Sequence, residues 1–197
     1  TGPKAATSVV HKITYQTTET LYEQANQSGE EFDNKMDEAL KDANDLQKNI
    51  DEMQRKLLEK KNLSYEDKKQ LNELLEKQKD MMRQMEQAKE KLQDQIEKAE
   101  ENNLYTPEVM EKLNQLEKMM QDLNTPEFQK FLEKMQKDME NMDNQQLKKM
   151  MEELQKDSEA FKEQIERTME LFKQLKVQQK VEEMVQKLDN MEKRQDM

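Results

Sequence analysis

Catalytic chemistry in this 197-residue chain would depend on few residue types, because the sequence has a single histidine and no cysteine. Nucleophilic catalysis by a triad or a Cys–His pair needs an imidazole base or a thiolate. The histidine, His11, has no second histidine and no cysteine to join it in holding a metal ion. We interpret it as an ordinary side chain on the face of a strand.

Other motifs that carry chemistry are also missing. Two glycines, Gly2 and Gly29, cannot form a Gly-rich phosphate-binding loop, and the Glu-x-x-His motif of di-iron bundles does not occur. The 44 acidic residues interleave with 33 basic ones, which is typical of solvated helix faces rather than of a dry pocket that raises a carboxyl pKa. We therefore predict no catalytic, cofactor-binding or metal-ligating residues, no cofactor and no enzymatic activity.

The composition favours long helices. Charged residues make up 39% of the chain and hydrophobic residues 32%, with two glycines and three prolines. An ordinary globular domain carries more apolar and turn residues, so the choice is between a disordered polyampholyte and helices with narrow apolar seams. Regularly spaced leucines and methionines favour the helices. The net charge of −11 and the absence of a basic face argue against nucleic acid, and no apolar run is long enough for direct membrane insertion.

The clearest pattern lies between residues 32 and 57. Apolar residues recur there in alternating steps of four and three: Phe32, Met36, Ala39, Ala43, Leu46, Ile50, Met53 and Leu57. This heptad pattern predicts a helix that packs against another helix. Gly29 keeps the same phase, although Ser28 and Glu31 could restart the helix there. We expect one continuous helix to about Lys61.

A capped turn then predicts a hairpin. Ser64 and Asp67 form a capping box, so the chain turns at 62–65 and residues 17–103 form an antiparallel helical hairpin. The expected register places Leu46 opposite Met82 and Gly29 opposite Ala99.

This register leaves polar residues in the seam and apolar residues outside it. Gln78 faces Ile50, which we interpret as a device that fixes register, and Lys89 faces Ala39. Leu74, Met81 and Ala88 make the apolar surface of the second helix too wide for one partner. We therefore expect a third element to cover them.

The second half of the chain contains three helix starts. Thr106-Pro107-Glu108 and Thr125-Pro126-Glu127 predict two short Thr-Pro-capped helices within 104–142, and Asp143 with Gln146 predicts a long helix within 143–197. The apolar seam of the long helix comprises Leu147, Met151, Leu154, Phe161, Ile165, Thr168, Phe172 and Leu175, followed by Val177, Val181, Met184, Leu188 and Met191. The two runs differ slightly in phase near Lys176, so we expect the contact face to shift or the helix to bend there.

Residues 1–16 differ from the rest. Val9, His11, Ile13 and Tyr15 alternate with their neighbours as in a β-strand. A single strand is not stable alone. The segment is therefore either an extended tail or the remnant strand of a preceding β domain. Because the chain starts at Thr1 rather than methionine, we expect it to be a piece of a larger protein.

Two segments resemble a known family. Leu63–Asp80 (LSYEDKKQLNELLEKQKD) and Arg167–Gln195 (RTMELFKQLKVQQKVEEMVQKLDNMEKRQ) are similar to a domain-of-unknown-function family (number 4175). Its members are large membrane-anchored helical envelope proteins of Bacteroidota-type bacteria, and the similarity covers roughly residues 9–195. The resemblance implies a cell-envelope location and a membrane anchor upstream of Thr1. It transfers no catalytic residues.

The expected fold is therefore all-α: a long antiparallel helical hairpin (coiled coil), then two short helices and a long C-terminal helix, packed as an elongated bundle. We expect a scaffold or spacer that binds protein partners, or associates with itself, through helix faces. The alternative is a holdase-like chaperone that grips apolar client segments with methionines. Its candidate groove comprises Met81, Met82, Met85, Met119, Met120, Met135, Met139, Met142, Met150 and Met151.

Overall fold

The computed structural model describes residues 17–59, 64–123 and 126–195, and this part of the chain is helical with no strand. The helices are α1 (Thr18–Glu59), α2 (Tyr65–Glu101), α3 (Pro107–Leu123), α4 (Pro126–Asp138), a 3-10 turn η1 (Met139–Asn141) and α5 (Asn144–Gln195). The strand expected within residues 1–16 lies outside the described residues.

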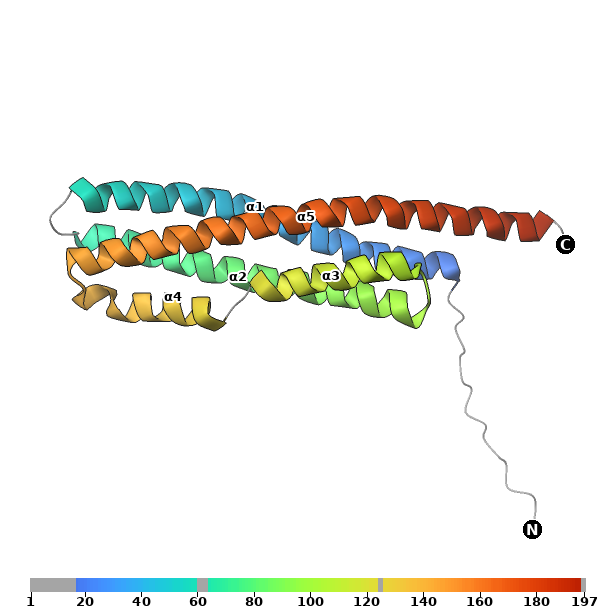
Figure 1. Cartoon of the computed structure of the whole chain (residues 1–197), viewed down its shortest axis with the longest axis horizontal. Helices are drawn as coiled ribbons and strands as arrows, with labels where there is room; N and C mark the ends of the chain where they lie inside the picture. The colour runs from blue at the N-terminus through green and yellow to red at the C-terminus, as the bar shows by residue number, and fades with distance from the viewer. Residues whose placement is uncertain (1–16, 60–63, 124–125, 196–197) are drawn as a thin grey trace, which may run out of the picture.

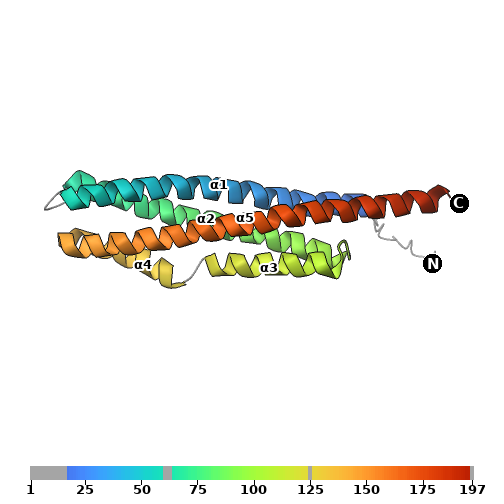
Figure 2. The same cartoon turned by 45° about the horizontal axis from the view of Figure 1, so that its top comes forward.

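The helices form an elongated bundle, as expected (Figure 1). Helices α1 and α2 run antiparallel along its length, and α5 lies against α1. Helices α3 and α4 follow one another along α2, and α3 also packs on α5 (Figures 1 and 2). In both views the C-terminal end of α5 extends past the start of α1, so its last turns have fewer neighbours than the rest of the helix.

Local capping explains where the helices begin. The Asp67 backbone N–H donates to Ser64 Oγ at 3.2 Å and the Ser64 N–H donates to Asp67 Oδ2 at 2.9 Å, which confirms the predicted box at the start of α2. The corresponding distances for Asp143 and Gln146 are 2.8 and 3.0 Å. Each box satisfies two N–H groups that the first helical turn leaves unpaired.

The helices are continuous at both positions where the sequence suggested a break or a bend. Helix α1 passes through Gly29 and α5 passes through Lys176 without interruption. The second short helix, α4, ends at Asp138 and is followed by the 3-10 turn η1.

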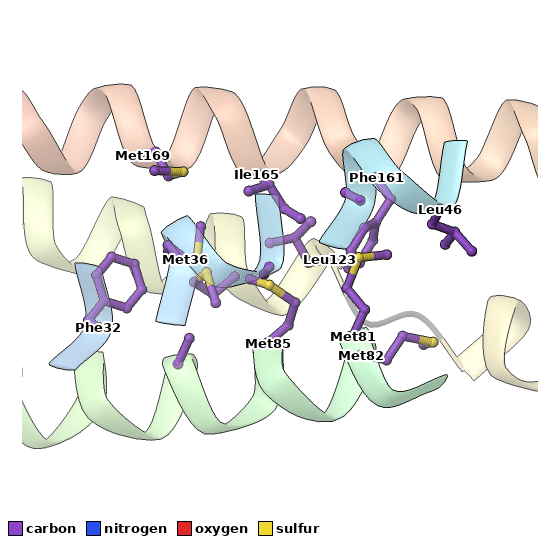
Figure 3. Packing of buried hydrophobic residues seen from close by; sticks show 14 of the residues in the cluster. Phe32, Met36, Leu46, Met81, Met82, Met85, Leu123, Phe161, Ile165 and Met169 are labelled. Carbon is purple, nitrogen blue, oxygen red and sulfur yellow. The ribbon is translucent and has the colours of Figure 1, made fainter. Parts of the chain in front are cut away.

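One continuous apolar core runs along the bundle. Figure 3 shows side chains of α1, α2, α3 and α5 converging on it, with Met36, Met85 and Ile165 near its middle. The rings of Phe32 on α1 and Phe172 on α5 meet edge to face, with centroids 4.6 Å apart. Leu74, Met81 and Ala88, the surplus apolar residues of α2, are all buried in this core.

The predicted register of the hairpin is wrong by one helical turn. A Cβ atom built on Gly29 would lie 2.8 Å from Gln95 Nε2, whereas the expected neighbour was Ala99. Polar contacts beside the seam are displaced in the same direction: Lys35 with Gln87 at 2.9 Å, Asp42 with Gln84 at 3.1 Å and Lys56 with Gln70 at 2.6 Å. Met82, the expected partner of Leu46, lines a surface hollow with Leu132 of α4.

The observed register is better because it keeps a lysine out of the seam. Lys89, which was expected opposite Ala39, instead reaches Glu86 Oε1 at 3.3 Å on the surface. Burying an unpaired ammonium against alanine would cost several kcal/mol. The buried Gln78 also has a role that the sequence did not reveal: its Oε1 accepts a hydrogen bond from Ser158 Oγ at 3.1 Å and so joins α2 to α5.

The close approach of Gly29 and Gln95 predicts an energetic coupling between them. Replacing glycine by alanine inside a helix normally gains about 1 kcal/mol. We expect Gly29→Ala to gain nothing in the native background, because the new methyl group would displace the Gln95 amide, and to regain about 1 kcal/mol when combined with Gln95→Ala. Chemical denaturation of the four proteins measures this. Strictly additive effects would contradict the observed register.

Candidate functional site

Exposed apolar side chains are concentrated on the last part of α5. Six of its residues are between 50% and 64% exposed: Val177, Val181, Met184, Val185, Leu188 and Met191. We call them the C-terminal stripe. The other large apolar side chains that are exposed in the described residues, Leu58 and Tyr65, lie beside the turn between α1 and α2. The stripe is therefore the one extended apolar surface that the described part of the bundle leaves uncovered.

The stripe points away from the bundle. Phe172, Leu175 and Gln179 of α5 are buried against the other helices. At 100° per residue, most of the stripe lies on the opposite side of the helix from these three residues. Its last residue, Met191, lies at the edge of the stripe, where it lines a hollow with Thr18 and Glu19 of α1. The predicted change of contact face near Lys176 thus takes an unexpected form: the first apolar run is buried and the second is exposed, without a break in the helix.

Polar contacts fix the inner face of the same helical segment. The Thr106 backbone N–H donates to Glu182 Oε2 at 2.9 Å and the Asn26 amide donates to Glu183 Oε2 at 3.1 Å. The Gln186 amide donates to the Leu104 carbonyl oxygen at 3.4 Å. We call these contacts the latch. Because they hold the inner face, they prevent α5 from rotating to bury the stripe.

Two tyrosines form the apolar support of the latch. Tyr22 and Tyr105 are both buried and meet edge to face, with ring centroids 5.6 Å apart. The Tyr22 hydroxyl donates to the Leu104 carbonyl oxygen. Burial, together with the negative charges of Glu182 and Glu183, raises the pKa of Tyr22 to about 12. The pKa of Tyr105 is raised as well, mainly by burial.

The latch was not predictable from the local sequence. The Thr106 side chain was expected to cap α3, but its hydroxyl bonds to Glu182, 76 residues away. The sequence signal for the stripe is the change of phase near Lys176. This signal does not indicate which of the two apolar runs the bundle leaves exposed.

The described residues contain many carboxylates but no histidine or cysteine. No group of three or more histidine, cysteine, aspartate or glutamate side chains in these residues is placed so that it could hold a metal ion. His11 lies outside the described residues. Within the described ranges no helix has the length and apolarity needed to cross a membrane.

Most methionines of the candidate groove are packed inside the bundle rather than exposed on one surface. All ten methionines of the candidate groove, from Met81 to Met151, are buried or partly buried. Seven of them occupy core positions between helices, whereas Met142 and Met150 line a surface hollow with Phe131. Met184 and Met191 are exposed, and both belong to the stripe.

Comparisons with protein-family models, with curated proteins and with solved structures find no match to this chain.

The stripe should contribute little to folding. Leu175 is fully buried, so we expect Leu175→Ala to lower the free energy of unfolding by about 2–5 kcal/mol. The matched change Leu188→Ala, on the same helix but 60% exposed, should alter the free energy of unfolding of the monomer by at most about 0.5 kcal/mol. Urea denaturation at low protein concentration measures both. A large loss for Leu188→Ala would mean that the stripe is covered within the monomer.

The latch predicts a loss of stability in alkaline solution. An unfolded tyrosine releases its proton near pH 10, whereas folded Tyr22 holds it to about pH 12. The folded state therefore binds more protons in this window, so the stabilising contribution is complete below about pH 10 and declines as the pH rises towards 12. Denaturation of the native protein and of Tyr22→Phe across this range measures the effect, and the variant should have the shallower slope. Equal slopes would contradict it.

Proposed function

We propose that this chain is a non-enzymatic helical scaffold or spacer within a larger cell-envelope protein, and that it docks a partner helix on the C-terminal stripe. The observation that carries the proposal is an apolar helix face that is held outward by polar contacts. An exposed apolar surface is unfavourable in water unless something covers it.

The spacing of the stripe favours a helical occupant. Val177, Val181, Met184, Leu188 and Met191 follow steps of four and three, the heptad pattern by which one helix packs on another. Their combined exposed area is several hundred Å², which is at the upper end of the patches that monomeric proteins expose.

The dimensions of the bundle suit a spacer. The 52 residues of α5 span about 78 Å at about 1.5 Å per residue. Contacts between α1 and α5 run from Gln54 with the Met151 carbonyl oxygen to Asn26 with Glu183, and they include an ion pair between Lys176 Nζ and Asp33 Oδ2 at 2.7 Å. Such a rod holds its ends at a fixed separation. The cell-envelope location rests on the family resemblance of Leu63–Asp80 and Arg167–Gln195 alone.

Site-specific photo-crosslinking in cells tests the proposal. A photoreactive residue at position 188 of the full-length protein should give one or a few discrete protein adducts. The same residue at Gln115, which is exposed on α3, should give none. Adding Val181→Glu should abolish the adducts from position 188 without changing the amount of protein. Adducts of equal yield from both positions, or none from position 188, would contradict a docking role for the stripe.

A further inference from the structure

We propose that the occupant of the stripe is a second copy of this chain, aligned parallel and in register over residues 177–192. This inference rests on the proposed docking role and names its partner. The charges that border the stripe favour this partner and this orientation, and most of the stripe faces away from the chain's other helices.

The two borders of the stripe carry different charges. Lys180 and Lys187 each directly precede an apolar position of the heptad, namely Val181 and Leu188, and they form a basic border. Val185 and Glu192 directly follow the apolar positions Met184 and Met191 and form the opposite border, which is apolar and acidic. All four border residues are exposed. Lys187 lies beside the first turn of α1, where it lines a hollow with Thr18 and Glu19.

This asymmetry makes the stripe complementary to itself in one orientation. In a parallel two-stranded coiled coil, the residue before the first core position of a heptad faces the residue five positions later on the partner. Lys187 then lies beside Glu192 of the second copy, and the symmetry of the pair forms this contact twice. Lys180 lies beside Val185, where its methylene groups can cover the valine.

The antiparallel orientation is less favourable. It brings the two basic borders together, so that Lys180 and Lys187 of one copy approach the same residues of the other. Like charges in such positions destabilise a helix pair. Lys187 is partly neutralised by Glu183, which lies 2.8 Å away on the same helix. Lys180 has no such ion pair among those of the described residues, so its charge would still repel the partner's lysines. Orientation is therefore set by the borders, and affinity by the apolar layers.

Parallel pairing is sterically possible because the bundle lies behind the stripe. The latch holds Glu182, Glu183 and Gln186 on the inner face. Two copies can meet back to back, with α5 at the centre and the remaining helices outside. The end of α5 that extends past α1 is free to supercoil (Figure 2).

The expected affinity is modest. A stable interface buries about 800 Å² on each partner, and the stripe offers less apolar area than that. We therefore expect a reversible monomer–dimer equilibrium with Kd on the order of 10–100 µM.

Cysteine crosslinking tests the orientation, since the native chain contains no cysteine. The purified full chain would carry either Val177→Cys or Met191→Cys, at opposite ends of the stripe. Parallel pairing predicts that each variant forms a disulfide with its own kind at least ten times faster than Gln115→Cys does. In a mixture of two copies that differ in mass, disulfides between position 177 and position 191 should be absent. Mainly mixed 177–191 disulfides would overturn the parallel orientation.

A charge exchange tests the borders independently. Glu192→Lys replaces the predicted Lys187–Glu192 pair by two lysines and should weaken the dimer five- to tenfold in sedimentation equilibrium. The double variant Lys187→Glu with Glu192→Lys exchanges the charges and should return Kd to within about threefold of the native value. An unchanged Kd for Glu192→Lys would overturn the proposed border contact.

The outcomes also separate this inference from the docking function. A purified chain that stays monomeric at millimolar concentration, while position 188 crosslinks to a different protein in cells, rejects self-pairing and leaves the docking function intact. If the purified chain stays monomeric and position 188 also gives no adduct in cells, both self-pairing and the docking function are rejected.

Discussion

The structure depends on covering apolar seams in a chain that has few apolar residues. Only 32% of the sequence is hydrophobic, so each helix can bury only narrow surfaces and must align them with those of its neighbours. Helix α2 is the strongest example, because it contacts α1, α3 and α4. Its register against α1 is determined by what α3, α4 and α5 cover at the same time. Polar residues such as Gln78 and Ser158 then restrict the alignments that remain.

This dependence explains which features could be predicted from the sequence. The starts of α2 and α5 are determined within a few residues by Ser64 with Asp67 and by Asp143 with Gln146, so the local sequence was sufficient. The all-α bundle followed from heptad spacing and from the scarcity of glycine and proline. The register could not be obtained in this way, because a two-helix argument could not distinguish the two apolar stripes of α2. The structure places Gln95, not Ala99, against Gly29.

The candidate site shows the same division between local and distant information. The stripe residues were identified as apolar and regularly spaced, but their exposure depends on Glu182, Glu183 and Gln186 being held by residues far away in the sequence. A change of phase within a helix indicates that one face ends and another begins. It does not indicate which face the rest of the molecule covers. Only the packing of Phe172, Leu175 and Gln179 settles that question.

The latch also has a mechanical consequence, because the beginning of α1 and the last third of α5 lie at the same end of the rod (Figure 1). A force that draws these two termini apart acts first on the contacts of Glu19 and Tyr22 with Lys187 and Gln186, and then on Asn26 with Glu183. It then separates α1 from α5 one helical turn at a time, beginning at this end of the bundle. Each turn yields separately, so the force required is small. If tension reaches the bundle through these two termini, the molecule would lengthen gradually under modest load rather than resist and then rupture.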